Sequence, residues 1–336
     1  MTRAPVTDPP AGPTCSVVVA AYNAAQSIDA TIASVLAQTR TDLEVIVVDD
    51  GSTDETASHV QAHADARVRL YHQENQGPSA ARNKAIANAT GRYVSTIDSD
   101  DLWLPRYLEM MVATLEHTPD AGFAFTDAWA LEESSGRFRR ATAMSRSKVT
   151  DPPVEAESFL EALIQENFVY GSVTARLEVL EEVGGFNTAV SHSEDYELWL
   201  RIAARGHRGV RVAGPPLAIV RDRAGARHHD ERSMLIGIRD AMQMLLEHEP
   251  PVPPRARSVA QERLTTMEAL LDGSWGRRLP DRILANVRRL GAGATRELRG
   301  RRRRLAKPPP EVAASFPDLG HGLRPGPAQR PSAPGR

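Results

Sequence analysis

Runs of strand-forming residues alternate with amphipathic segments in the N-terminal part of the chain. Apolar runs that close in polar residues predict buried strands, and four of them occur, at residues 15–23, 42–54, 66–73 and 91–101. The segments between them place apolar residues at helical spacing, at residues 24–39, 54–64 and 77–90. Strands that alternate with helices and are rich in Val and Ile indicate a mostly parallel sheet covered on both faces.

The pattern becomes mixed after residue 105. A strand is predicted at 122–133, and a strand with a turn is predicted within 209–223. Six further segments have helical periodicity: 158–167, 175–186, 193–206, 232–247, 255–272 and 281–290. The helix at 193–206 is the most clearly marked, because Glu194 and Asp195 stand in its first turn and Gly206 ends it.

Polar side chains gather where the predicted strands end. Tyr22 follows the first strand, Asp49 and Asp50 close the second, and Asp98 and Asp100 close the fourth. In open sheets of this kind, ligands bind beyond the carboxyl ends of the strands. We therefore expect a binding site at this edge, where the two acidic groups could meet.

Asp98, Asp100 and Asp101 form a dense acidic group. Their charges repel one another, and a hard divalent cation such as Mg²⁺ or Mn²⁺ would relieve that repulsion. Mg²⁺ uses few protein carboxylates and completes its shell with water and substrate phosphate, which implies a substrate that carries phosphate. The simpler interpretation is that the three residues cap turns and the next helix. The second acidic pair, Asp49 and Asp50, favours the metal site.

Neither of the common nucleotide-binding loops occurs. The chain has no G-x-x-x-x-G-K-[ST] sequence and no G-x-G-x-x-G sequence after a strand. P-loop enzymes and dinucleotide-binding enzymes are therefore excluded, and phosphate must be bound in another way.

Composition indicates an ordinary globular protein. Of the 336 residues, 41% are apolar and 25% are charged, which is typical of soluble domains. No apolar stretch reaches the length of about 18 residues that a membrane-spanning helix needs, and the N-terminus lacks the apolar core of a secretory signal. We expect a cytoplasmic protein whose one cysteine, Cys15, is buried.

The net charge of −2 conceals a strong asymmetry. Residues 251–336 carry 18 Lys and Arg against 7 Asp and Glu, whereas residues 1–250 carry 23 against 36. The basic stretch at 288–307 could make a peripheral contact with the inner membrane surface, or it could be a solvated tail without a partner. Nucleic acid is disfavoured as a partner, because no aromatic residues are interleaved with the arginines.

Six segments carry a resemblance to a known family: SVVVAAYNAAQSIDATIASVLAQT, EVIVVDDGSTDET, NQGPSAARNKAI, GRYVSTIDSDDLWLP, VGGFN and SEDYELWLR. In this order and spacing, over residues 15–225, they resemble the family 2 glycosyltransferases with the GT-A fold. The resemblance implies an α/β fold with a mostly parallel sheet flanked by helices and a C-terminal helical extension. With the charge pattern, it divides the chain into a disordered N-terminus, a GT-A domain, a basic helical extension and a disordered Pro-rich tail, at 1–14, 15–230, 231–306 and 307–336.

Members of this family transfer a sugar from a nucleotide diphosphate donor with inversion at the anomeric carbon. The resemblance thus implies a metal-dependent glycosyltransferase that uses Mn²⁺ or Mg²⁺, in the synthesis of cell-surface polysaccharide, glycolipid or a related glycoconjugate. UDP- or dTDP-sugars are the expected donors, and the acceptor would be a glycan, a lipid-linked molecule or a small molecule. The chain lacks the Gln-x-x-Arg-Trp motif of processive members, so we expect one sugar to be added per encounter.

The resemblance also implies a set of nucleotide-binding residues. Ala20 and Tyr22 would line the base pocket, and Asp49 would hydrogen-bond the base or the ribose. Arg82 would face the nucleotide phosphates, and Asp98 would contact the ribose.

Metal ligands and a general base follow from the same resemblance. Asp100 would ligate the metal, with Asp98 and Asp101 in the same site. Asp195, with Glu194 beside it, matches the family's general base. Amide dipoles at the start of its helix favour the ionised carboxylate, which predicts an ordinary pKa. A plain helix-capping acid is the simpler interpretation.

The residues alone leave two other functions open. One is a Mg²⁺-dependent phosphotransferase with an Asp-x-Asp nucleophile, and the other is a non-catalytic nucleotide-sugar-binding protein tethered by its basic tail. Some GT-A enzymes use a late histidine as a metal ligand, so His228 or His229 could join the metal. Surface histidines are the simpler interpretation.

Overall fold

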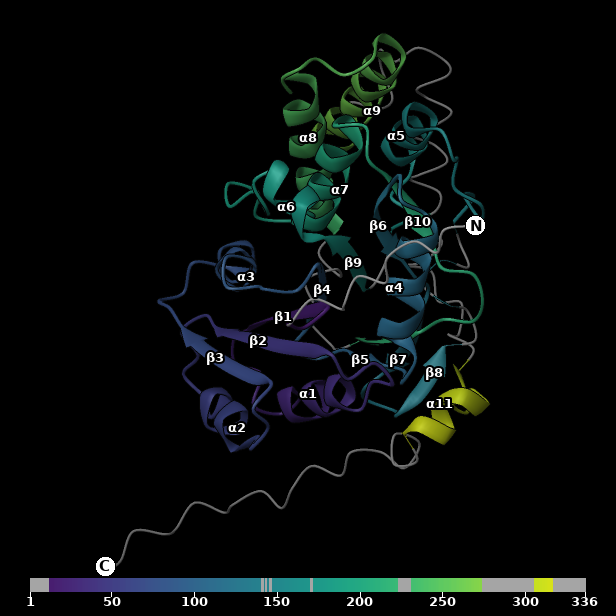
Figure 1. Cartoon of the computed structure of the whole chain (residues 1–336). Helices are drawn as coiled ribbons and strands as arrows, with labels where there is room; N and C mark the ends of the chain where they lie inside the picture. The colour runs from purple at the N-terminus through teal and green to yellow at the C-terminus, as the bar shows by residue number, and fades with distance from the viewer. Residues whose placement is uncertain are drawn as a thin grey trace, which may run out of the picture.

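The structure is a computed structural model, and it describes residues 12–139, 142, 144, 147–169, 172–222, 231–273 and 305–316. Figure 1 shows a large sheet with helices on both sides and a second, smaller sheet next to it. The predicted helix at 281–290, the basic stretch up to residue 304 and both His228 and His229 lie outside the described residues.

The larger sheet has seven strands within the described residues, in the order β10-β6-β9-β4-β1-β2-β3. They are β1 (Cys15–Ala21), β2 (Leu43–Asp49), β3 (Val68–His72), β4 (Tyr93–Asp98), β6 (Ala121–Phe125), β9 (Val173–Arg176) and β10 (Arg208–Arg211). Neighbouring strands run parallel except where β9 pairs with β4 and β6. The predicted mostly parallel sheet is therefore confirmed.

Helices cover both faces of this sheet, as predicted. They are α1 (Ile28–Leu36), α2 (Thr56–Ala62), α3 (Pro78–Ile86), α4 (Tyr107–His117), α5 (Ala156–Gln165), α6 (Leu177–Glu182) and α7 (Glu194–Ala204). Successive side chains of a strand reach opposite faces. Ile46 and Val48 of β2 accordingly join an apolar cluster with α3, α5, α6 and α7, whereas Val45 and Val47 join one with α1, α2 and α4. Burial on both faces explains why β2 is apolar without alternation.

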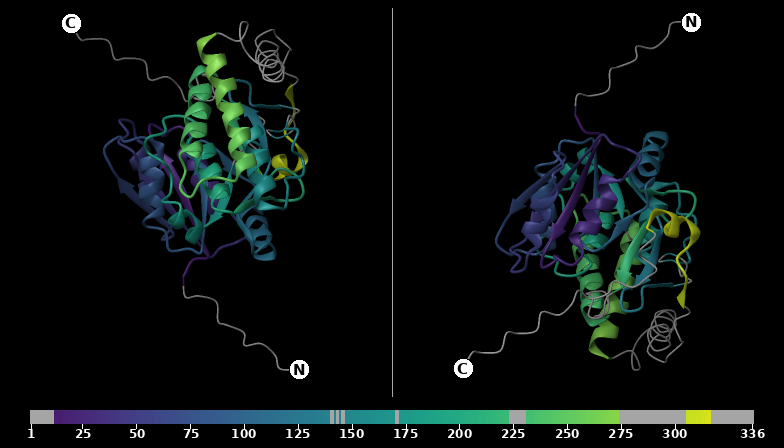
Figure 2. Two further views of the ribbon diagram at one scale, coloured as in Figure 1. Left: turned by 90° about the horizontal axis from the view of Figure 1, so that it is seen from above. Right: turned by 90° about the horizontal axis from the view of Figure 1, so that it is seen from below.

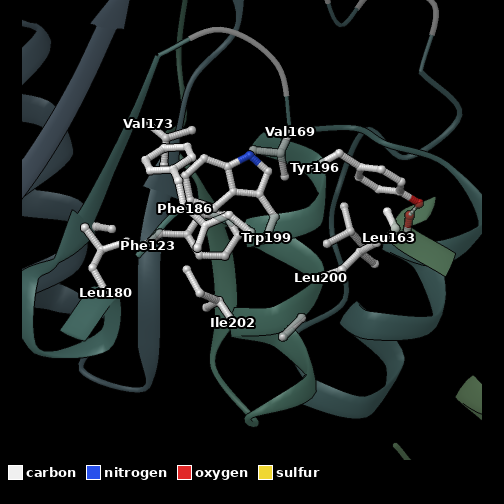
Figure 3. Close-up of a cluster of buried hydrophobic side chains, with 14 of the residues drawn as sticks. Phe123, Leu163, Val169, Val173, Leu180, Phe186, Tyr196, Trp199, Leu200 and Ile202 are labelled. Atoms are coloured by element: carbon white, nitrogen blue, oxygen red, sulfur yellow. Dashed lines mark hydrogen bonds between the residues drawn. The ribbon is translucent and has the colours of Figure 1, made fainter. Parts of the chain in front are cut away.

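Aromatic packing fixes helix α7 in the core. The ring of Trp199 is stacked on that of Phe123, with 5.0 Å between the ring centroids, and Figure 3 shows both inside one cluster of apolar side chains. The Tyr196 hydroxyl donates a hydrogen bond of 2.9 Å to the carbonyl oxygen of Leu163. Because Tyr196 directly follows Asp195, this packing holds the first turn of the helix in place.

The smaller sheet has the strand order β12-β8-β7-β11-β5. Its strands are β5 (Leu102–Trp103), β7 (Ala128–Glu132), β8 (Arg137–Arg139), β11 (Ala218–Asp222) and β12 (Leu305–Ala306). Strand β5 starts directly after the acidic group at 98–101, so its pairing with β11 helps to hold the backbone that follows the acidic group.

Two long helices form the described part of the C-terminal extension. Helices α8 (Glu231–Leu246) and α9 (Pro254–Asp272) pack against each other and against α7 and α5, and Figure 2 shows them side by side. Within the described residues, none of the helices combines the length and the apolar composition that crossing a membrane requires.

Residues 307–316 differ from the prediction, and the rest of the predicted tail, residues 317–336, lies outside the described residues. We expected a disordered tail from residue 307, but residues 305–316 form β12 and helix α11 (Pro310–Ser315). Val312 of α11 is fully buried. The segment has few apolar residues of its own, and it folds because the smaller sheet supplies the apolar partner.

Two other elements also differ from the prediction. The strand expected at 122–133 is divided into β6 and β7, because the carboxylate of Asp127 accepts hydrogen bonds from the backbone N–H groups of Ala128 and Met144. The helix expected at 175–186 begins as strand β9, and α6 follows it. Strand β9 has the sequence VTAR, and four alternating residues next to a helical pattern are too few to indicate a strand.

Candidate active site

The strands bring the predicted site residues to one edge of the larger sheet. Strand β1 lies between β2 and β4, and its register pairs Ala20 with Asp98 and Ala21 with Asp49. Since neighbouring strands lie about 4.8 Å apart, the acids that end β2 and β4 are separated by the width of β1. The prediction that they share one edge is confirmed.

Asp49 and Asp50 nevertheless do not join the other acids. Asp49 accepts a hydrogen bond of 3.0 Å from the N–H of Ser52. Asp50 accepts hydrogen bonds of 2.9 Å each from the N–H groups of Gln76 and Gly77. Both carboxylates thus organise the loops that follow β2 and β3. The expectation that the two acidic groups could meet in one metal site is wrong.

Asp98, Asp100 and Asp101 do form a cluster, which we call the acidic cluster. One carboxylate oxygen from each lies within 4.8 Å of the others, and this is the group of potential metal ligands found among the described residues. Burial raises the pKa of Asp101 well above its ordinary value, and the charges of Asp98 and Asp100 raise it further. A divalent cation would relieve this repulsion. Three carboxylates are the hard oxygen donors that Mg²⁺ and Mn²⁺ prefer, so the residues fit such an ion.

The backbone around Asp101 is fixed by two distant residues. The N–H of Arg221 in β11 donates to a carboxylate oxygen of Asp101 at 3.1 Å, and the Thr31 hydroxyl of α1 donates to its carbonyl oxygen at 2.9 Å. The sequence analysis missed both contacts. Thr31 is a buried polar residue on the apolar face of a helix, which could have indicated a role. A main-chain contact such as that of Arg221 has no side-chain pattern.

Arg82 connects the acidic cluster to helix α7. Its guanidinium donates to Asp98 at 2.8 Å and to Glu194 at 3.0 Å, and it lies 5.2 Å from the ring centroid of Phe186. Burial alone would lower the pKa of Arg82, but the carboxylates of Asp98 and Glu194 outweigh that effect and raise it. The side chain of Asp98 is still 61% exposed, so a ligand can reach it.

Asp195 stands at the solvent-facing start of α7. Its carboxylate accepts a hydrogen bond of 2.7 Å from the N–H of Tyr196. Desolvation by the surrounding protein raises the pKa of Asp195 to about 6, and the charge of Glu194 adds to this effect. The predicted ordinary pKa is therefore wrong, because these two effects outweigh the amide dipoles. The residue keeps contact with solvent, so water still screens its charge.

The loop before Asp195 adopts a constrained conformation. Ser193 has a φ of 58°, which lies in the left-handed region that few non-glycine residues adopt. Gly237 of α8 faces this loop so closely that a Cβ atom there would collide with the carbonyl oxygen of His192. The C-terminal extension thus touches the segment that carries Asp195.

The remaining predicted residues lie at the end of β1. Tyr22 is 51% exposed, which leaves its ring available to a ligand, and Ala20 is partly buried next to Asp98 in the register. The structure thus brings Ala20, Tyr22, Asp98 and Arg82 to one edge, with Asp195 and Glu194 joined to it through Arg82.

Comparison with known proteins agrees with this arrangement. The profile of the family described as Glycosyl transferase family 2 matches residues 16–173. The Escherichia coli protein WfgD, named UDP-Glc:alpha-D-GlcNAc-diphosphoundecaprenol beta-1,3-glucosyltransferase, is 30% identical over 190 residues, which are 56% of this chain and 68% of WfgD. The chain belongs to glycosyltransferase family 2. Escherichia coli chondroitin synthase is a longer relative of this family 2 chain. It is 31% identical over 196 residues, which are 58% of this chain and 27% of chondroitin synthase.

Solved structures show the same fold. Staphylococcus aureus TarS 1–349 superimposes with a TM-score of 0.61 at 17% identity, over 82% of this chain and 78% of TarS. The mannosyltransferase PcManGT of Pyrobaculum calidifontis, in complex with GDP-Man and Mn²⁺, has a TM-score of 0.56 at 22% identity, over 85% of this chain and 81% of PcManGT. The GT-A fold is therefore confirmed, and the chain is a sugar-transferring enzyme.

Proposed function

We propose that this glycosyltransferase is metal-dependent and inverting, and that the acidic cluster holds the Mn²⁺ or Mg²⁺ ion to which a nucleotide diphosphate sugar binds. The observation that carries this proposal is the convergence of three carboxylates within 4.8 Å at the end of β4. Asp100, Asp98 and Asp101 would hold the ion. When bound, it would supply positive charge next to the leaving diphosphate.

Arg82 supplies fixed positive charge at the same place. Cleavage of a sugar–diphosphate bond builds up negative charge on the leaving phosphate, and a preorganised cation stabilises that charge as it develops. Arg82 is held by Asp98 and Glu194 before any donor binds. It therefore needs little reorganisation when the charge appears.

Asp195 would act as the general base. A base works best when its pKa lies near the operating pH, and the pKa of Asp195 is raised to about 6. Its carboxylate is ionised at neutral pH and can accept a proton from an acceptor hydroxyl. A single base and a single displacement give inversion at the anomeric carbon.

The donor and the acceptor are proposed by analogy. TarS has been solved with UDP and with UDP-GlcNAc, which supports a UDP-sugar for this chain, with dTDP-sugars as the second choice. WfgD is named for a diphosphoundecaprenol acceptor, which supports a lipid-linked acceptor and a role in polysaccharide or glycolipid synthesis. One sugar per encounter, the cytoplasmic location and the membrane contact through 288–307 stay predictions. A phosphotransferase is disfavoured, because the named relatives given above transfer sugars.

The proposed base can be tested with Asp195→Asn. A panel of UDP- and dTDP-sugars identifies the donor through thermal stabilisation, since a ligand that binds the folded form raises the unfolding temperature. We expect Asp195→Asn to lower the transfer rate about 10²- to 10⁴-fold with donor binding unchanged, and NMR of the product to show the inverted anomer. The matched control is Asp42→Asn, at an exposed acid before the start of β2, at the opposite edge of the sheet from the site. Full transfer by Asp195→Asn would eliminate this residue as the base.

A further inference from the structure

Residues 305–316 form a short segment that is docked on the smaller sheet, and we call it the C-terminal clamp. Its strand β12 pairs antiparallel with β8, so that Leu305 lies opposite Arg139 and Ala306 opposite Phe138. Its helix α11 covers the sheet with the fully buried side chain of Val312. Figure 1 shows α11 next to β8, and both views of Figure 2 show the clamp against the same sheet.

The clamp completes a separate apolar cluster. Val312 shares this cluster with five buried side chains, four from the smaller sheet and one from the residue that follows β5. The five are Leu102, Leu104, Leu131, Phe138 and Ile219. Phe316 is partly buried and packs against the cluster. Without the clamp, this cluster would lose the side chain of Val312, and its other apolar side chains would become more exposed to water.

The same apolar cluster includes residues next to the acidic cluster. Leu102 is the residue after Asp101, and it pairs with Ile219 in the register of β5 and β11. Arg221, two residues after Ile219, donates the backbone hydrogen bond of 3.1 Å to the Asp101 carboxylate. Val312 therefore packs in one cluster with residues of both strands that set the position of Asp101.

The two residues of strand β5 pack in different clusters. The ring of Trp103 stacks on that of Tyr107 in the core of the larger sheet, with 3.9 Å between the ring centroids, whereas Leu102 packs in the cluster of Val312. The register of the strand with β11 consists of two residue pairs. So short a strand depends on side-chain packing for its position, because close-packed interiors transmit any loss of volume to their neighbours. The packing that includes Val312 is therefore expected to reach the backbone at Asp101.

We propose that the C-terminal clamp is a positioning element for the metal site, and that contacts made by Val312 set the affinity of the acidic cluster for a divalent ion. This inference rests on the proposed metal role of that cluster. Hydrogen-bond partners of metal ligands typically change metal affinity by about 10- to 100-fold. Val312 acts on Asp101 through Leu102 and Ile219, so we expect an effect at the low end of this range. The clamp lies outside residues 16–173, which the family profile matches.

Neighbouring positions on α11 offer a matched pair of variants. Val312 is fully buried, whereas Ala313 is exposed. Val312→Asp should weaken Mn²⁺ binding about tenfold or more, and Ala313→Asp, with the same added charge, should bind Mn²⁺ as the wild type does. Free Mn²⁺ is measured in the absence of substrate, by electron paramagnetic resonance, so the result does not depend on activity. UDP affinity without metal should be the same in all three proteins.

Folding is checked separately. Circular dichroism and the unfolding temperature show whether Val312→Asp is folded. If it is not folded, the milder variant Val312→Ala is measured instead. We expect it to lower the Mn²⁺ affinity about threefold, which is less than the 10- to 100-fold effect of a direct partner of a metal ligand.

The outcomes separate this inference from the proposed function. Wild-type protein that binds no Mn²⁺, with or without UDP, would refute the metal site itself, and if Mn²⁺ binds only in the presence of UDP, the variants are compared with UDP present. Wild-type binding that is lost in Asp100→Asn but unchanged in the Val312 variants would leave the metal site intact and overturn the role of the clamp. Equal weakening in Val312→Asp and Ala313→Asp would also overturn it, because added charge alone would then explain the effect.

Discussion

Asp195 combines contact with solvent and a raised pKa, and both properties suit a residue that must take a proton from an incoming hydroxyl. The charged groups that influence its pKa are Glu194, Arg82 and Asp98. Glu194 raises the pKa of Asp195, whereas Arg82 lowers it and Asp98 raises it. The ionisation of the proposed base therefore depends in part on Arg82 and Asp98, which are also proposed to bind the sugar donor.

The pH dependence of transfer follows from this raised pKa. Only the ionised carboxylate accepts a proton, so kcat/KM should be constant above the pKa and fall as the pH drops through about 6, by on the order of tenfold per pH unit below it. Glu194→Gln removes a negative charge next to Asp195, and it should therefore move this midpoint to lower pH. An unchanged or higher midpoint in Glu194→Gln would contradict the assignment of Asp195.

For single residues, the sequence predicted which of them lie at the carboxyl edge of the larger sheet but not which of them are in contact. Asp49 and Asp98 end parallel strands, and parallel strand ends meet at one edge. The contact between Arg82 and Glu194 joins residues 112 positions apart, and it depends on how α7 packs on the sheet. The raised pKa of Asp195 depends on the same packing, so it could not be predicted from local sequence.

Helix α8 is the part of the C-terminal extension that contacts the loop before Asp195, the proposed base. Gly237 allows it to approach the backbone at His192, and Ser193 next to it is held with a positive φ. The extension therefore contributes to the position of Asp195, although it lies outside the part of the chain that the family profile matches.

Gly237→Ala tests this contact. The added Cβ must push the loop away, and a shift of about 1 Å at a catalytic group can lower the rate by about 100-fold. We expect kcat to fall by on the order of 10- to 100-fold, with the KM for the donor unchanged, because the donor-binding edge lies on the sheet. Gln243→Ala is the control on the same helix, at an exposed position. Equal kinetics for the two variants would exclude a positioning role for α8.

Long, periodic elements were predictable, and short buried ones were not. The alternation of strands and helices through residue 101 follows from apolar periodicity, which is reliable for long segments. Strand β9 is buried throughout its four residues, and β5 and β12 have two residues each. Elements of this length carry no detectable period, and tertiary contacts alone decide them.

For the whole molecule, the charge balance gives a reason for the proposed metal dependence. Residues 1–250, which contain the site, carry 36 acidic against 23 basic residues. A surface with an excess of negative charge repels an anionic nucleotide diphosphate. Arg82 is already engaged by two carboxylates, so it offsets only part of this repulsion, and a divalent ion in the acidic cluster would offset more.

The folded C-terminal segment is also a property of the whole molecule. Composition indicates that residues 307–336 have too little apolar surface to fold alone. It could not indicate that residues 305–316 fold against a sheet made by distant segments, because the partner surface exists only after the domain has formed.

The most direct test of the central claim is the affinity for UDP, measured by calorimetry with and without MnCl₂, in the wild type and in Asp100→Asn. Metal and nucleotide that share a site must strengthen each other's binding by the same factor. We expect Mn²⁺ to raise the UDP affinity of the wild type by about tenfold or more and to have no effect on Asp100→Asn. Equal UDP affinity of the wild type with and without Mn²⁺, or full enhancement in Asp100→Asn, would contradict this claim.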